Sequence, residues 1–231
     1  MPADEEMPGA RMHGVIGLIG GTGPLGKGLA LRMARDGRRV LIGSRTIERG
    51  QQIADWVLER APRADVQGAT NLDAATNGEV VALTIPYGGI EETLPPLADA
   101  LAGKVVMCCI NQIGFDRQGP FELQDGKPSS AEQCQALLPG ARVVGAFHHV
   151  AAGALAGSES VDVDVLLSSD DDDAMEIVAG LVRLVPGMRP VAVGALRLAG
   201  PSEHFTAVLV AINHRHKIKA GVRLVGLVRE D

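Results

Sequence analysis

The chain has 231 residues, 46% of them hydrophobic, and a formal net charge of −6. This length accommodates one large domain with a small appendage, and the acidic balance lacks the basic surface that nucleic-acid binding requires. No apolar run approaches the roughly 20 residues of a membrane helix, and three cysteines are too few for a disulfide framework. We therefore expect a soluble cytoplasmic protein that binds neither nucleic acid nor membrane. Residues 1–12 are expected to form a flexible acidic tail rather than a signal peptide.

The first elements in chain order alternate between strand and helix. Residues 15–19 form a short apolar run that predicts a buried strand, and apolar residues then recur at helical spacing until Gly37. Residues 40–42 predict a second strand, and residues 47–58 predict a second helix with Thr46 as its cap. This order is that of a nucleotide-binding βαβ unit.

The later elements continue the alternation. Apolar runs predict strands at residues 80–85, 105–110, 143–147, 161–167 and 191–193. Helical patterns fall at residues 90–101, 131–138, 173–184 and 202–219, and loops rich in glycine occupy residues 111–130 and 148–160. The alternation predicts an α/β fold: a doubly wound Rossmann sheet, mostly parallel, with a small C-terminal helical extension. We expect the sheet domain to span residues 13–196 and the helical part to span residues 197–231.

A glycine-rich turn joins the first predicted strand to the first helix. In a G-x-G-x-x-G turn, one glycine makes the tight turn, one lets the backbone approach a pyrophosphate, and one lets helix and strand pack closely. The N-terminus of the helix then presents free N–H groups to the phosphates. The predicted dinucleotide site comprises Gly20, Gly21, Thr22, Gly23, Pro24, Leu25 and Gly26. The alternative is a glycine turn that serves packing only.

The end of the second predicted strand distinguishes the two nicotinamide dinucleotides. An NAD site places Asp or Glu there, whereas this chain has Ser44 and Arg45, with Arg49 one helical turn later. A hydroxyl and two guanidinium groups suit a 2′-phosphate, because arginine binds phosphate oxygens through charge-assisted hydrogen bonds. These residues predict an NADP-dependent oxidoreductase. The alternative is that Ser44 caps the second helix and both arginines are solvated.

Five sequence blocks together resemble the F420-dependent NADP reductases, over residues 14 to about 227. Residues 19–30 are similar to the opening of that family, and Gly43-Ser44-Arg45 is similar to its 2′-phosphate loop. Thr84-Ile85-Pro86 matches the strand end beside the nicotinamide. Two further blocks are similar to the bacterial branch of the family: Phe147-His148-His149 and the stretch from Phe205-Thr206 to Ala220-Gly221.

The resemblance implies reversible hydride transfer between reduced coenzyme F420, a 5-deazaflavin, and NADP(H), in a homodimer. Residues 197–231 would close a cleft in which the deazaflavin lies over the nicotinamide. Carried over position by position, the 2′-phosphate would be held by Thr22, Ser44, Arg45 and Arg49. The deazaflavin or the nicotinamide would be bordered by Thr84, Ile85, Pro86, His148, Val150 and Thr206.

His148 is the predicted catalytic residue. It follows a strand end with His149, where α/β sheets place ligands. One imidazole is expected to donate a hydrogen bond to the deazaflavin, and a pKa near 6.5 would let it balance the charge that develops on reduction. The alternative is a pair of loop histidines whose polar atoms are satisfied by backbone groups.

Two other functions share this dinucleotide site. The chain departs from archaeal members of the family at Ala151 and His204, both in blocks expected to touch the deazaflavin. An NADPH-dependent reductase of another acceptor, such as an imine or a metal chelate, would look similar. A nonenzymatic NADP(H)-sensing protein would keep the dinucleotide site with a closed second cleft.

The remaining polar and sulfur residues predict no metal site. His214 and His216 are two apart on a predicted helix and therefore point to different faces. Cys108 and Cys109 lie inside an apolar strand, where thiols behave as small hydrophobic groups. The cations near the C-terminus are either a solvated face or the binding partners of the acidic F420 tail: Lys217, Lys219 and Arg223.

Overall fold

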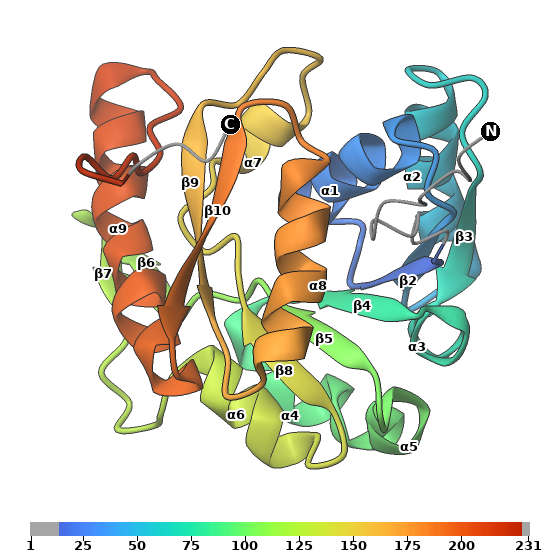
Figure 1. The fold of residues 1–231 in the computed structure, drawn as a ribbon, viewed down its shortest axis with the longest axis horizontal. Helices are drawn as coiled ribbons and strands as arrows, with labels where there is room; N and C mark the ends of the chain where they lie inside the picture. The colour runs from blue at the N-terminus through green and yellow to red at the C-terminus, as the bar shows by residue number, and fades with distance from the viewer. Residues whose placement is uncertain (1–13, 228–231) are drawn as a thin grey trace, which may run out of the picture.

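The computed structural model describes residues 14–227, which form a central sheet with helices on both faces (Figure 1). Within this range the sheet has eight strands in the order β10-β9-β8-β5-β4-β1-β2-β3. The strands are β1 (Ile16–Ile19), β2 (Val40–Ser44), β3 (Val66–Thr70), β4 (Val80–Leu83), β5 (Val105–Cys108), β8 (Arg142–Gly145), β9 (Val163–Ser168) and β10 (Met188–Gly194). The predicted tail at residues 1–12 lies outside the described residues.

The direction of the strands explains why the sheet is mostly parallel. Strands β1 to β5 and β8 pair in parallel, as the helical connections between them require. Strand β9 meets β8 antiparallel at Gly145 and Ser168, and β10 then pairs in parallel with β9. The doubly wound, mostly parallel sheet predicted from the sequence is therefore confirmed, with two reversed strands at one edge.

Helices cover both faces of the sheet because successive strand residues point to opposite sides. Along β4, Val80 and Ala82 join one buried cluster with α1 and α8, whereas Val81 and Leu83 join a second cluster on the other face. The helices are α1 (Pro24–Arg35), α2 (Ile47–Leu58), α3 (Asn71–Asn77), α4 (Ile90–Thr93), α5 (Ala98–Leu101), α6 (Ser130–Leu137), α7 (Ala152–Leu155), α8 (Asp172–Arg183) and α9 (Ala199–His216).

Several predicted elements differ from the observed ones. The helix expected at residues 90–101 is divided into α4, a 3₁₀ turn (Pro95–Leu97) and α5, because Pro95 and Pro96 cannot continue the hydrogen-bond ladder. Strand β3 and helix α3 were not predicted from the sequence. The expected loop at 111–130 contains a hairpin, β6 (Ile113–Asp116) with β7 (Gly119–Glu122), and the loop at 148–160 contains α7.

The C-terminal helix α9 stands beside the edge of the sheet, next to the hairpin β6–β7 (Figure 1). Its Glu203 is fully buried and accepts hydrogen bonds from the N–H groups of Ser130 (2.8 Å) and Ala131 (3.1 Å) at the start of α6. These bonds dock α9 against the sheet domain. The division at residues 196 and 197 stays a prediction. No helix within residues 14–227 is long and apolar enough to cross a membrane.

Candidate active site

The carboxyl ends of β1 and β4 lie side by side where the strand order reverses, the place at which α/β sheets bind ligands. The turn after β1 begins at Gly20, whose φ of +69° favours glycine. The N–H of Gly20 donates to the side-chain oxygen of Asn71 (3.1 Å). After β4, the Thr84 N–H and hydroxyl both donate to the carbonyl of Ile19, at 2.9 and 3.1 Å. The two strand ends are thereby held in register.

The glycine turn between β1 and α1 has three crowded positions, Gly20, Gly21 and Gly26, and one open position, Gly23. A Cβ on Gly26 would lie 2.6 Å from the Cα of Gly21, so these residues need glycine for close packing of the helix. A Cβ on Gly23 would meet no described atom nearer than 4.0 Å. The space above Gly23 is therefore available to a bound group. This agrees with the sequence analysis, in which one glycine of the turn lets the backbone approach a pyrophosphate.

The N-terminus of α1 is suited to an anion. Pro24 occupies its first turn, and no side chain caps it. The first turn also contains no acidic residue. Its unpaired N–H groups and the positive end of the helix dipole therefore face the open space above Gly23. Thr22 lies in the same turn and is half-buried.

The end of β2 presents two exposed guanidinium groups. Ser44 is buried at the strand end, and Thr46 occupies the N-cap position of α2 without a side-chain capping bond. Thr46 rather than Ser44 therefore begins the helix, contrary to the alternative in which Ser44 is the cap. Arg45 and Arg49 are exposed and form no ion pair with any residue in 14–227.

Helix α2 holds Arg49 close to β2 because Gly50 has no side chain. A Cβ on Gly50 would lie 2.3 Å from the carbonyl oxygen of Ile42. The close contact brings the first turn of α2 against the strand and leaves Arg45 and Arg49 beside the same strand end. These side chains have the chemistry of a 2′-phosphate site.

Residues 84–86 lie next to the glycine turn. Ile85 is buried, and a Cβ on Gly20 would lie 2.5 Å from the Ile85 Cγ2. Pro86 is exposed and precedes a short 3₁₀ turn (Tyr87–Gly89). The strand end therefore presents an apolar surface that carries no ionisable group.

A cavity of about 420 Å³ opens beside the start of α1. Leu25 of the glycine turn lines one side, the loop after β8 lines another, and α9 lines a third. The cavity brings four predicted site residues together: Leu25, His148, Val150 and Thr206. Ser44, Arg45 and Arg49 do not line it and form a separate part of the site at the end of β2. Its one cationic lining residue within the described chain is Lys219.

The loop after β8 is fixed to its neighbours by hydrogen bonds. Phe147 is fully buried with a φ of +61°, an uncommon conformation for a residue with a side chain. The carbonyl of the next residue, His148, accepts from the Thr206 hydroxyl (2.7 Å) and from the Asn111 amide (3.1 Å). These bonds join the loop to α9 and to the segment after β5, so three walls of the cavity meet at one carbonyl.

The loop is also anchored to α1 on its other side. The buried guanidinium of Arg32 donates to the carbonyls of Leu155 (2.9 Å), Ala154 (3.1 Å) and Glu159 (2.7 Å). A Cβ on Gly28 would lie 2.6 Å from the Leu155 Cβ, so the helix α7 rests directly on the backbone of α1. The dinucleotide turn and the cavity wall therefore belong to one packed unit.

The side chain of His148 lies inside the protein, and this corrects part of its predicted role. Its Nδ1 is 3.1 Å from the carbonyl of Ile110, which can only accept, so Nδ1 carries the proton. Its Nε2 is buried without a partner among the described residues. Burial, with a smaller contribution from His149, lowers the pKa of His148 to about 3. The expectation of a pKa near 6.5 is wrong, because a buried imidazole loses the solvation of its charged form.

His149 is held in the same way. Its Nε2 lies 2.7 Å from the carbonyl of Asp164, and burial lowers its pKa. In each ring one nitrogen binds a backbone carbonyl, while the other nitrogen, Nε2 of His148 or Nδ1 of His149, is buried without a partner among the described residues. Each donates its one ring N–H to the protein, so neither has a ring proton to offer a ligand. His148 lines the cavity, and its role as a catalytic residue stays a prediction.

Two residues of the site, Asn71 and Asn111, were missed from the sequence, whereas Lys219 was left open as either a solvated residue or a partner of the F420 tail. Asn71 holds Gly20, Asn111 holds the His148 carbonyl, and Lys219 lines the cavity. The capping-box pattern from Thr70 to Asp73 is a sequence signal that would have located Asn71 at the start of a helix. Asn111 carries no comparable signal, because its partner, His148, lies 37 residues later in the sequence.

Thiols and metal-ligand groups contribute nothing further to this site. Cys108 and Cys109 are buried, and burial raises the pKa of Cys109 well above its ordinary value. The Sγ atoms of Cys108 and Cys134 lie 3.8 Å apart, within a weak thiol hydrogen bond. Within residues 14–227, no three side chains of His, Cys, Asp or Glu gather in a way that could hold a metal ion.

Comparisons with known proteins place these features in context. A family profile described as NADP oxidoreductase coenzyme F420-dependent matches residues 15–112. The F420-dependent NADP reductase of Methanothermobacter thermautotrophicus is 39% identical over 226 residues, covering 94% of this chain and 97% of the relative. The F420-dependent NADP reductase of Methanocaldococcus jannaschii is 33% identical over 222 residues, covering 92% and 98%.

A solved structure shares the whole fold. A protein from Arthrobacter sp. fb24 superposes with a TM-score of 0.77, covering 91% of this chain and 98% of its own. The two sequences are 22% identical, so this likeness concerns the arrangement of the elements. The sequence relatives and the shared fold both extend well beyond the glycine turn.

Proposed function

The chain belongs to the F420-dependent NADP reductase family, and we propose that it transfers hydride reversibly between reduced coenzyme F420 and NADP at the carboxyl edge of its sheet. The observation that carries this proposal is the shared position of two features. The uncapped N-terminus of α1 and the cavity lined by Val150 and Thr206 adjoin each other at Leu25. One substrate can therefore lie against the glycine turn while the other occupies the cavity.

The dinucleotide fits the glycine turn. The open space above Gly23 admits a pyrophosphate, and the N–H groups at the start of α1 would bind its oxygens. The turn would contribute Gly20, Gly21, Thr22, Gly23, Pro24, Leu25 and Gly26. Thr84, Ile85 and Pro86 would border the nicotinamide, because the end of β4 lies beside the turn.

The preference for NADP rests on the end of β2. Arg45 and Arg49 are exposed and unpaired within the described chain, and they stand beside Ser44 and near Thr22 in the adjacent turn. We propose that these four residues hold the 2′-phosphate. No carboxylate stands in the stretch 43–47 to accept hydrogen bonds from the ribose hydroxyls of NAD.

The acceptor cavity positions its ligand without acid or base chemistry. When bound, the nicotinamide and the deazaflavin supply the hydride donor and acceptor. Two apolar side chains lie on the sides that would face the nicotinamide and deazaflavin rings. Ile85 lies at the end of β4, and Val150 lines the cavity. His148 is neutral, so we propose that it orients the wall through its carbonyl while Thr206 fixes that carbonyl. Orientation of two reactants contributes a large part of the rate in such reactions.

We further propose that the enzyme acts in the cytoplasm as a homodimer, since the resemblance implies a dimer and the sequence predicts a cytoplasmic protein. Three of the four phenylalanines are exposed, which is compatible with a surface that another protomer covers: Phe115, Phe121 and Phe205.

The test is reduction of purified F420 by NADPH and by NADH, followed by the absorbance of oxidised F420. We expect turnover with NADPH and at least about tenfold less with NADH, as expected from loss of charge-assisted bonds to the 2′-phosphate. Reduction of an imine or a ferric chelate without reduction of F420 would favour another acceptor. Tight NADPH binding with no acceptor reduced would favour a sensor.

A further inference from the structure

The segment after α9 forms a wall of the cavity. Helix α9 ends at His216, and Lys217 adopts a left-handed conformation with a φ of +57°, which reverses the chain. The next two residues, Ile218 and Lys219, line the cavity. The N–H of Ala220 then donates to the side chain of Asn213, one of the α9 residues that line the same cavity (2.5 Å).

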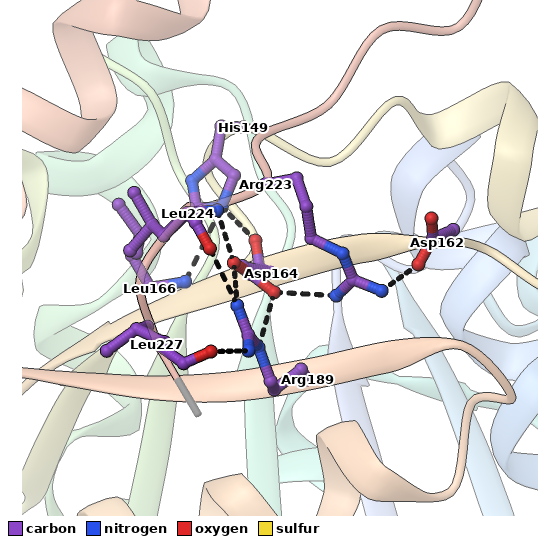
Figure 2. Close-up of polar contacts among 8 residues, drawn as sticks. All are labelled: His149, Asp162, Asp164, Leu166, Arg189, Arg223, Leu224 and Leu227. Atoms are coloured by element: carbon purple, nitrogen blue, oxygen red, sulfur yellow. Dashed lines mark hydrogen bonds and ion pairs between the residues drawn. The ribbon is translucent and has the colours of Figure 1, made fainter. Parts of the chain in front are cut away.

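The far end of this segment is held by a buried carboxylate, Asp164 of β9. Figure 2 shows the guanidinium groups of Arg223 and Arg189 converging on it. Asp164 accepts from Arg223 (2.7 Å), from Arg189 (2.8 and 2.7 Å) and from the N–H of Leu224 (2.6 Å). Arg223 also pairs with Asp162. Although burial opposes its ionisation, the hydrogen bonds from Arg189 and from the Leu224 N–H keep the pKa of Asp164 below its ordinary value.

The main chain of Asp164 connects the segment to a second wall of the cavity. Its N–H donates to the carbonyl of Val222 (2.7 Å), and its carbonyl accepts from the ring of His149 (2.7 Å). His149 lies in the loop after β8 that lines the opposite side. One residue of β9 therefore sets the separation between the loop and the C-terminal segment.

Close packing reinforces these bonds. A Cβ on Gly221 would lie 2.3 Å from Cγ1 and 3.2 Å from Cβ of Val163, the residue before Asp164. Valine is branched at Cβ and has little rotational freedom, so a larger residue at 221 would push the segment away from β9.

We propose that residues 217–224 are a latched wall of the acceptor cavity, and that Arg223 and Asp164 are positioning residues that hold Ile218 and Lys219 against the deazaflavin substrate. This inference rests on the proposed function for the identity of that substrate. The latch, by which we mean the hydrogen bonds of residues 222–224 to Asp164, lies within the chain and does not depend on which substrate binds. Releasing it loosens the acceptor side while leaving the dinucleotide side intact.

The first test is Arg223→Gln, which frees the segment but leaves Arg189 to neutralise Asp164. Its matched control is Arg142→Gln. Arg142 also pairs with an aspartate, Asp171, and its side chain is 33% exposed against 32% for Arg223. We expect KM for F420 to rise about tenfold, equivalent to about 1.4 kcal/mol, with kcat changed less than about twofold. The control should leave both constants unchanged, and Arg223→Lys should restore part of the loss.

The second test moves the segment sterically without changing charge. Gly221→Ala should raise KM for F420 in the same way, whereas Gly180→Ala, whose Cβ would meet nothing within 4 Å, should not. Two further measurements follow the two sides of the site separately: hydrogen exchange reports on the C-terminal segment, and the Kd for NADP reports on the dinucleotide side. Hydrogen exchange of the amides at 218–224 should become faster in both latch variants, and the Kd for NADP measured by calorimetry should stay within about twofold of the parent.

The outcomes separate the latch from the proposed function. Unchanged exchange at 218–224 in Arg223→Gln would show that no latch exists. Faster exchange with an unchanged KM would show that the segment is not a wall of the acceptor site. A parent enzyme that binds NADP but reduces no F420 would overturn the proposed function and the assignment of the acceptor, while the exchange data would still decide whether the latch is present.

Discussion

The two halves of the site are built in different ways. The glycine turn and the proposed 2′-phosphate site come from residues 16–50, a single strand–turn–helix–strand–helix stretch whose local backbone geometry forms them. The acceptor half combines segments near residues 111, 150, 206 and 219, which meet only in the folded chain. A local site of this kind can be found from spacing alone, whereas a site assembled from distant segments is defined by its hydrogen bonds.

The halves also differ in how they use charge. At the end of β2, Arg45 and Arg49 are exposed and ready to bind an anion. In the acceptor half the imidazole of His148 is buried and neutral, and Lys219 supplies the positive charge that lines the cavity. We therefore expect binding on the first side to depend on two exposed arginines, and binding on the second to depend on the cavity walls and one lysine.

The largest effect is expected from reversing a charge on the dinucleotide side. Arg45→Glu replaces a charge-assisted bond to the 2′-phosphate by repulsion, so affinity for NADP should fall about 100-fold or more. Affinity for NAD should not fall, because NAD lacks that phosphate. Calorimetric titration with both dinucleotides measures the difference.

Arg63→Glu is the matched control for that variant. Arg63 is exposed and forms no ion pair with any residue in 14–227, so the charge change is the same. NADP binding unaffected by Arg45→Glu, or weakened equally by Arg63→Glu, would contradict the assignment of the 2′-phosphate site.

A smaller effect is expected where the backbone itself binds. Gly23→Ala keeps an allowed conformation, with φ −74° and ψ 168°, and its Cβ meets no described atom nearer than 4.0 Å. The melting temperature should therefore stay the same. The added methyl would occupy the space proposed for the pyrophosphate, so affinities for NADP and NAD should both fall about tenfold. Normal binding by this variant would place the pyrophosphate elsewhere.

The smallest effect is expected from pH on the acceptor side. Because the pKa of His148 is about 3, its imidazole does not titrate between about pH 6 and 8, and hydride transfer should show no inflection from it. Rates measured in single turnover across this range test the point. An inflection near pH 6.5 that disappears in His148→Gln would contradict the neutral assignment.

The same residue makes stability depend on pH. Its folded-state pKa lies below the ordinary value, so below about pH 6.5 the unfolded chain binds a proton that the folded chain does not. The free energy of unfolding should be greatest above about pH 6.5 and should fall as pH decreases toward 3, by up to about 1.4 kcal/mol per pH unit. In His148→Gln, the free energy of unfolding measured with urea should change less with pH than it does in the parent protein.

Much of the fold was predictable because its signals are local. The strands at residues 40–42 and 105–110 and the helix at 47–58 appear as apolar runs or helical spacing, and all are present. Strand β3 has polar residues on its exposed edge and α3 is only seven residues long, so both fall below what periodicity detects. Pro95 and Pro96 lie near the middle of the helix predicted at residues 90–101, where the structure has a 3₁₀ turn instead.

The glycine turn and the two arginines after β2 could be located from the sequence because each depends on the spacing of neighbouring residues, and the family followed from short blocks of similar sequence along the chain. The burial of His148 and the position of Lys219 could be established only from the folded chain. The pKa of an imidazole depends on burial, and burial depends on segments that approach from elsewhere in the chain. Lys219 reaches the cavity because Asp164, more than fifty residues earlier, holds the segment that carries it.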